Sequence, residues 1–276
     1  MIPISIQTWI VQELSFLGTA LFCEYADTTT ARSLRVREPD RKGFMKMLPQ
    51  VLFNQFFVLL PCMILTEWLG LCFTGISYST LIRIFVIFYG MALGHDIVQY
   101  TTHRFLLHNH NIRLMRVLRH SVHHTTTASR GISACYMFPT DYFLEIVLPY
   151  LVPLAVLGGG GMSRLFHFPV AGLGAAGGVY EHSGYDLCLS FHLHDKIPAG
   201  SEGSLKSYVL NLLFKWLSGT LDNRAHGEHH ARANISFSDG FGSPEFCDTI
   251  FGTRWNVSKA RRQADKEWKT QWERFN

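Results

Sequence analysis

The sequence has little charge. Asp, Glu, Lys and Arg together make up 17% of its 276 residues, whereas hydrophobic residues make up 47%. Such a low charged fraction is unusual for a soluble domain of this size. The net charge of +4 is also too small to indicate binding to nucleic acid. These two shortages favour an integral membrane protein and exclude a basic nucleic-acid-binding module.

Paired cysteines are missing as well. The six cysteines form no Cys-x-x-Cys pair, and several lie within apolar runs. We therefore interpret them as reduced packing residues and not as a disulfide framework. Histidine is absent from the first 94 residues, but seven of the fourteen histidines fall within residues 95–124. This uneven distribution points to a site that begins at that stretch.

Two histidine triplets share the spacing His-x-x-His-His. They are His120, His123 and His124, and His226, His229 and His230. On a helix, positions i, i+3 and i+4 lie on one face. Three neutral imidazoles on one face suit a mid-row transition metal. With His103 and His108 the motif histidines number eight, which exceeds what one tetrahedral zinc would use, so two metal ions are predicted.

The first histidine pair has an irregular spacing. His103 and His108 are five residues apart, and a regular helix would turn the second ring about 140° away from the first. If His108 is a ligand, the helix must end after Arg104 or contain a π-bulge. His110 is the alternative, because seven residues align the rings while separating the Cα atoms by about 10 Å along the axis. We favour His108 and keep His110 open.

Apolar segments predict the membrane topology. Segments 47–66, 79–94, 146–163 and 165–180 are apolar and long enough to form two transmembrane helical hairpins. Segment 5–24 is apolar but interrupted by Gln7, Gln12 and Glu13, so it either spans the membrane or lies at its surface. We expect an all-α integral membrane protein with two hairpins, one possible extra N-terminal segment and a cytosolic, helical, histidine-rich metal-binding cap.

Arg and Lys residues orient this arrangement. They cluster at 32–46, 104–130 and 254–269, and two hairpins place all three clusters on the side that also holds the motif histidines. The positive-inside rule assigns that side to the cytosol. The predicted division of the chain is an N-terminal segment with a basic cytosolic loop (1–46), a membrane-embedded domain (47–254) and a polar cytosolic tail (255–276).

Four further motifs accompany the histidines. They are Asp-x3-Tyr-x2-His-Arg at 96–104, Glu-His-Ser-Gly-Tyr-Asp at 181–186, Asp-x2-Phe-Gly-Thr at 248–253, and Phe-Asn-Gln at 53–55. Taken with the histidine boxes, they resemble the sterol desaturase and fatty acid hydroxylase superfamily over roughly residues 50–254. One departure is that four residues separate His103 from His108, where close sterol-modifying relatives usually have three.

The resemblance implies a histidine-ligated non-haem diiron centre. By it, the iron ligands would be His103, His108, His120, His123, His124, His182, His226, His229 and His230. Asp96, Glu181 and Asp222 are candidates to accept hydrogen bonds from the ligand rings. His192 and His194 could supply a further ligand, but we interpret them as part of a polar loop.

The resemblance also implies the function. It indicates an O₂-dependent hydroxylase or desaturase of the endoplasmic reticulum membrane that acts on an unactivated C–H bond. We expect a lipid-like substrate such as a sterol or other terpenoid, with a fatty acyl chain as the alternative. The sequence carries no haem, flavin or nicotinamide motif, so separate proteins of the cytochrome b5 and NAD(P)H reductase type are expected to deliver electrons.

A transition-metal transporter with histidine ligands is the alternative from another functional class. Such a transporter should place its ligands near the bilayer midplane, on broken helices. Most of the motif histidines instead follow the apolar segments, in sequence that contains arginines. We therefore favour the enzyme.

Overall fold

The computed structural model describes residues 2–76, 80–109, 111–191, 214, 218–238, 240 and 242–256. Within these ranges the fold is helical, and its only extended pairings are two isolated β-bridges. The α-helices are α1 (Ile4–Ala26), α2 (Phe44–Asn54), α3 (Leu60–Trp68), α4 (Leu81–Thr102), α5 (Ile112–Leu118), α6 (Pro139–Tyr142), α7 (Leu148–Val156), α8 (Arg164–Glu181), α9 (Leu187–Ser190), α11 (Arg224–Arg232) and α12 (Phe246–Ile250). The 3₁₀ turns are η1 (Thr30–Leu34), η4 (His120–Thr125), η5 (Gly131–Cys135) and η7 (Gly159–Gly161), and the π-helical turns are η2 (Gln55–Leu59), η3 (His103–Leu107) and η6 (Phe143–Val147).

Three continuous helical stretches are long and apolar enough to cross a membrane. They are Phe44–Trp68, Leu81–Leu107 and Pro139–Val156. These stretches match three of the four expected segments, although the third begins at Pro139 and ends at Val156 instead of covering 146–163. The fourth expected segment forms α8, which is not among the three. The structure therefore indicates a multi-pass membrane protein, and the two-hairpin topology stays a prediction.

Each of these three stretches contains one π-helical turn. The turns are η2, η3 and η6. A π-turn inserts one extra residue into a helix and occurs frequently at functional sites. In this protein the turns lie beside the polar residues of the membrane helices: Asn54 and Gln55, His103, and Glu145.

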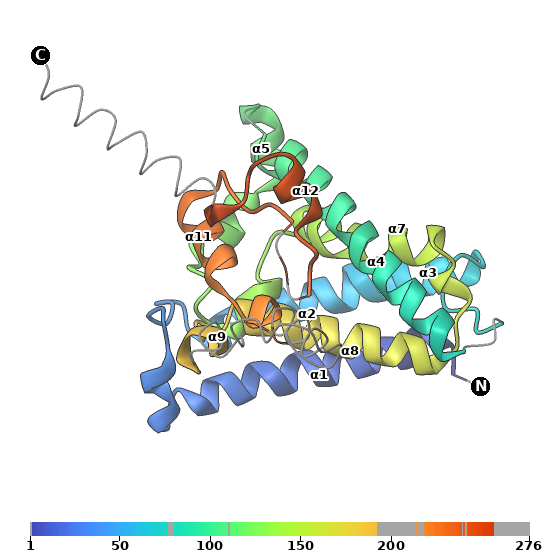
Figure 1. Ribbon diagram of the computed structural model, residues 1–276, viewed down its shortest axis with the longest axis horizontal. Helices are drawn as coiled ribbons and strands as arrows, with labels where there is room; N and C mark the ends of the chain where they lie inside the picture. Colours follow the sequence, from blue (N-terminus) through green and yellow to red (C-terminus); the bar gives the residue numbers. More distant parts are fainter. Residues whose placement is uncertain are drawn as a thin grey trace, which may run out of the picture.

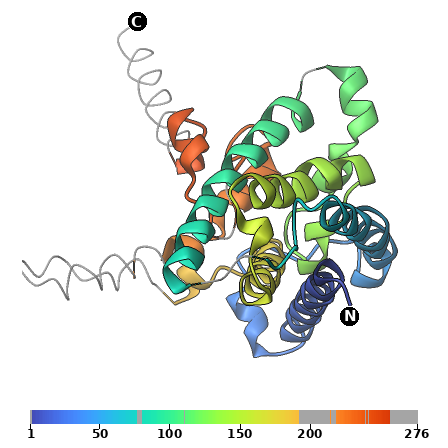
Figure 2. The same ribbon diagram turned by 90° about the vertical axis from the view of Figure 1, so that its right-hand side faces the viewer.

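Helix α1 packs along α8 and begins at the end of α3. The Glu67 carboxylate of α3 accepts hydrogen bonds from the backbone N–H groups of Ile4 and Ser5, at 2.9 and 3.0 Å. Further along, the Ser15 hydroxyl donates to the Gly172 carbonyl at 2.6 Å. Figures 1 and 2 show α1 and α8 side by side, with α2 and α3 running in nearly the same direction.

The side chains of α1 are arranged the opposite way from those of a helix on a soluble protein. Gln12 and Glu13 are buried, whereas Leu14, Leu21 and Phe22 are 71%, 56% and 67% exposed. Apolar side chains that face outward and polar ones that face inward suit a helix surrounded by lipid.

Close helix contact fixes α4 against α7. A Cβ atom at Gly94 would lie 2.8 Å from Cβ of Pro153 and 3.0 Å from Cδ1 of Leu157, so only glycine allows this approach. Helix α4 then continues into η3. Figure 1 shows α11 and α12 gathered at the end of the molecule away from the N-terminus.

Arginines of the basic loop hold this end together. Arg37 donates to the backbone carbonyl of Glu181 at 2.9 Å and to that of Asn223 at 3.0 Å. Arg35 pairs with Asp27 at 2.5 Å. A Cβ atom at Gly227 would collide with the Arg37 guanidinium at 1.8 Å, so glycine is required there. Part of the positive charge that the orientation argument counted is thus structural.

Candidate metal centre

The structure places the nine histidines named above in two adjacent groups. His103, His108, His120, His124 and His229 form the first group, and His123, His182, His226 and His230 form the second. Within each group the ring nitrogens all lie within 4.8 Å of one another. Seven of the nine side chains are buried, and those of His108 and His124 are half-buried. Metal binding by these residues stays a prediction.

The first pair is joined by a π-turn, as its spacing predicts. The His108 backbone N–H donates to the His103 carbonyl at 2.9 Å, which is an i+5 to i hydrogen bond. The ring centroids are then 4.9 Å apart instead of pointing to opposite sides. The expected bulge between Arg104 and His108 is therefore confirmed. His110, His192 and His194 lie outside the described residues.

Each triplet contributes to both groups. In α11, His226 and His230 belong to the second group and His229 to the first. Positions i and i+4 differ by about 40° around a helix, but i+3 and i+4 differ by about 100°, so the middle ring points to a different centre. The first triplet lies on the 3₁₀ turn η4 and divides in the same way. The expectation that three rings of a triplet serve one site was wrong.

Backbone carbonyls orient most of the rings. The Nδ1 atoms of His103, His182, His229 and His230 donate to the carbonyls of Phe237, Gly178, Ile235 and Thr126 at 2.8, 3.0, 2.6 and 3.0 Å. A carbonyl oxygen can only accept, so Nδ1 carries the proton and Nε2 keeps its lone pair. The Nε2 lone pairs therefore face the interior of each group.

The free ring nitrogens fit metal ions. Nε2 of His103 lies 3.2 Å from Nε2 of His120, and Nε2 of His226 lies 3.0 Å from Nε2 of His182. Two ligands about 2.1 Å from one metal ion are separated by about 3.0 Å or more. Nε2 of His229 and Nε2 of His230 are buried without a hydrogen-bond partner among the described residues. A shared cation would satisfy all these lone pairs, and the nitrogen-rich, thiolate-free set suits iron.

Burial keeps the rings neutral. Desolvation, reinforced by neighbouring histidines, lowers the pKa of His108 to about 3. Burial likewise lowers the pKa of His182 to about 3. The pKa values of His120, His123, His226, His229 and His230 are also lowered, with burial as the main cause. Because a metal binds only the neutral ring, these groups can bind metal at neutral pH with little competition from protons.

Asp96 and Asp248 shape the segment that supplies two of the orienting carbonyls. Asp248 accepts from the backbone N–H groups of Phe237 and Ser238 at 3.0 and 2.8 Å. Asp96 accepts from the Ser238 hydroxyl at 3.2 Å and from the Cys247 N–H at 2.9 Å. Asp96 thus acts on His103 through the position of the Phe237 carbonyl.

The other two predicted carboxylates lie nearby. The side chain of Asp222 forms an ion pair with Arg224, with Oδ1 2.8 Å from Nε. Glu181 offers its backbone carbonyl to Arg37 at 2.9 Å. A direct role of Asp222 or Glu181 toward a ligand ring stays a prediction.

Two carboxylates that the sequence reasoning did not name contact the rings. Asp141 accepts from Nδ1 of His120 at 2.9 Å, and Glu145 lies within 4 Å of ring nitrogens from His103, His120 and His123. They are the only acidic residues between positions 139 and 156. Two acids four residues apart in an apolar segment face the same side of a helix, which is the signal that could have found them.

One comparison with known proteins gives a match. The chain matches the family described as fatty acid hydroxylase over residues 88–253, which is more than half of its length and includes all nine histidines. No curated protein and no solved structure matches the chain.

Proposed function

The chain belongs to the fatty acid hydroxylase family of non-haem diiron membrane enzymes, and from this premise we propose that it hydroxylates or desaturates an unactivated C–H bond of a lipid. The observation that carries the proposal is the pair of adjacent groups of buried histidine nitrogens, which offer room for one iron each. Two bound irons would supply the reductive activation of O₂ that such a bond requires.

The protein residues would hold and orient these irons. Five rings of the first group and four of the second provide the ligands, and the Nδ1 hydrogen bonds fix their tautomers. Burial of the rings keeps bulk water from the reacting atoms. Ring contacts by Asp141 and Glu145 place negative charge beside the expected metals.

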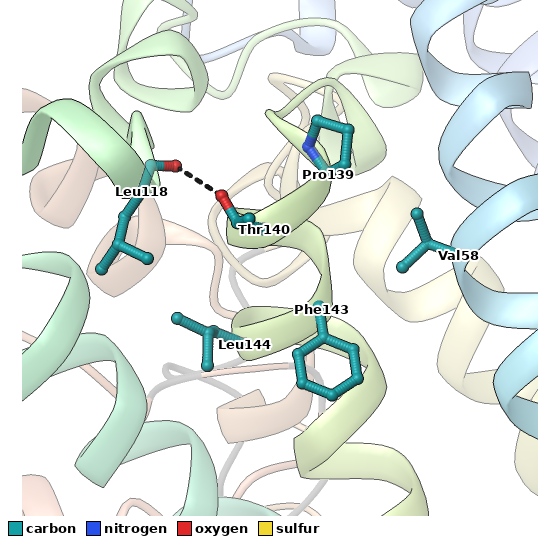
Figure 3. Close-up of a pocket in the computed structure, with 6 residues that line it drawn as sticks. All are labelled: Val58, Leu118, Pro139, Thr140, Phe143 and Leu144. Carbon is teal, nitrogen blue, oxygen red and sulfur yellow. Dashed lines mark hydrogen bonds between the residues drawn. The ribbon is translucent and has the colours of Figure 1, made fainter.

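An apolar pocket of about 370 Å³ supports a lipid-like substrate. It is lined by Val58, Leu118, Pro139, Thr140, Phe143 and Leu144, as Figure 3 shows. The helix that lines it also carries Asp141 and Glu145, and Leu118 lies two residues before His120. We infer that an apolar part of a sterol or other terpenoid, or alternatively a fatty acyl chain, lies in this pocket beside the metal centre.

We further propose an endoplasmic reticulum location with the histidine groups and the C-terminus in the cytosol. Electrons would come from a cytochrome b5 and NAD(P)H reductase system on that side. Helix α1 would cross the membrane, because its 23 residues span about 34 Å and its two ends lie near opposite ends of the bundle. It begins at Glu67, next to the turn at Gly75, and ends beside Asp27 and Arg35.

Product analysis tests the proposal. The protein would be expressed with a reductase system, purified in detergent, and assayed for iron content and for O₂-dependent lipid products by mass spectrometry. His123→Ala and His229→Ala should each abolish turnover and lower bound iron, while His95→Gln in α4, outside both groups, should retain both. A wild-type protein that binds no iron, or that moves metal ions across vesicles without forming product, would refute the proposed activity.

A further inference from the structure

We propose that Glu145 is a metal ligand that bridges the two histidine groups, so that both irons share one carboxylate. This inference rests on the proposed diiron function and adds a ligand that is not a histidine. Its basis is the position of a single buried side chain between the two groups.

The Glu145 carboxylate lies at a ligand-sharing distance from both groups. Its Oε1 atom is 3.9 Å from Nε2 of His103, in the first group, and 3.9 Å from Nε2 of His123, in the second. Two ligand atoms about 2.1 Å from one metal are about 3.0 Å apart at a right angle and about 4.2 Å apart when opposite each other. The same oxygen can therefore share one metal with His103 and a second metal with His123.

This carboxylate also lacks another partner to stabilise it. Glu145 is only 4% exposed, and its Oε2 atom has no hydrogen-bond partner among the described residues. The nearest ring N–H, Nδ1 of His120 at 3.4 Å, already donates to Asp141 at 2.9 Å. An unpaired buried carboxylate is strongly unfavourable unless a cation lies next to it.

The facing atoms make the same point. Nδ1 of His103 donates to the Phe237 carbonyl, so its Nε2 presents a lone pair toward Oε1. Two electron-rich atoms that face each other repel unless a positive charge lies between them. A metal ion at this position converts the repulsion into two coordination bonds.

The local fold separates Glu145 from Asp141. Both lie on the inner face of the stretch Pro139–Val156, and the π-turn η6 begins between them, at Phe143. Asp141 approaches one ring only and orients His120, whereas Glu145 reaches rings of both groups. A bridging carboxylate would hold the metals at the separation of about 3.5–4 Å that is common in two-metal sites.

Metal titration of the whole protein in detergent tests the bridge. Wild-type, Glu145→Gln and Asp141→Asn proteins are stripped of metal and titrated with Co²⁺, whose visible absorption reports each binding step. Glu145→Gln should weaken both steps by tenfold or more, because both metals lose a ligand. Asp141→Asn, the matched control on the same helix face, should weaken one step only. Binding steps in Glu145→Gln that are unchanged, or a loss confined to one step, would overturn the bridge.

Wild-type protein provides a second measurement, which does not depend on how the variants fold. X-ray absorption of the iron-loaded protein should show a metal–metal distance of about 3.5–4 Å. Two bound irons without a metal–metal distance in that range would overturn the bridge and leave the proposed activity standing. A wild-type protein that binds no metal would instead overturn the proposed activity itself.

Discussion

Deleting Leu106 from the π-turn η3 should leave the metal centre intact, whereas inserting an alanine after Leu106 should dismantle its first group. In the present turn, five residues separate His103 from His108, and the π hydrogen bond brings their rings together. The deletion leaves four residues, and a regular α-helix then places the rings about 40° apart on one face. The insertion leaves six residues, and the second ring points about 120° away.

The size of the effect follows from the number of ligands. Structural zinc sites with four ligands bind with about 10–16 kcal/mol, or about 3 kcal/mol per ligand. Loss of the His108 ring should therefore lower the affinity of the first group by about two orders of magnitude. Leu106 itself is 37% exposed, so its removal leaves little cavity.

A Co²⁺ titration of the two purified variants checks this prediction. The deletion variant should bind metal within about threefold of wild type, and the insertion variant should show one weakened step. A deletion variant that loses metal as severely as the insertion variant would refute the account of η3, provided that both proteins show wild-type helical content by circular dichroism.

Three further outcomes are expected. His108→Ala should lose bound iron and activity, whereas His110→Ala should lose little of either; the reverse result, measured by metal analysis and product formation, would shift the first box by two residues. Leu144→Trp in the apolar pocket should raise KM at least tenfold, while Val152→Trp, an exposed position on the same stretch, should not; equal KM values would exclude the pocket as a substrate site. Because folding lowers the pKa of His108 and His182 to about 3, the unfolded chain binds more protons below about pH 6.5, so the Tm of metal-free protein should be constant from pH 8 to 7 and fall between pH 6 and 4; a Tm that rises on acidification would contradict neutral buried rings.

Local spacing in the sequence predicted what depends on neighbouring residues. The irregular helix between His103 and His108 followed from angles alone, and the structure confirms it as η3. The membrane stretches were located by their apolar runs, although the third begins earlier because Thr140 and Asp141 interrupt its hydropathy.

Contacts between distant segments could not be derived in this way. Helix periodicity tells which rings of a triplet are neighbours, but not that His123 and His229 face different groups. Asp141 and Glu145 lie at least 17 positions from any group member along the chain, so their contacts depend on how the Pro139–Val156 stretch packs. Gln12 and Glu13 made segment 5–24 ambiguous, because their inward orientation depends on the neighbours of α1.

Iron stoichiometry of the purified wild-type protein tests the central claim most directly. Two adjacent groups of histidine nitrogens predict about two irons per chain, each with nitrogen-dominated coordination by X-ray absorption. His124→Ala should weaken the first iron and His226→Ala the second. A protein that saturates at one iron per chain, or whose iron is unaffected by either substitution, would contradict a diiron centre built from these two groups.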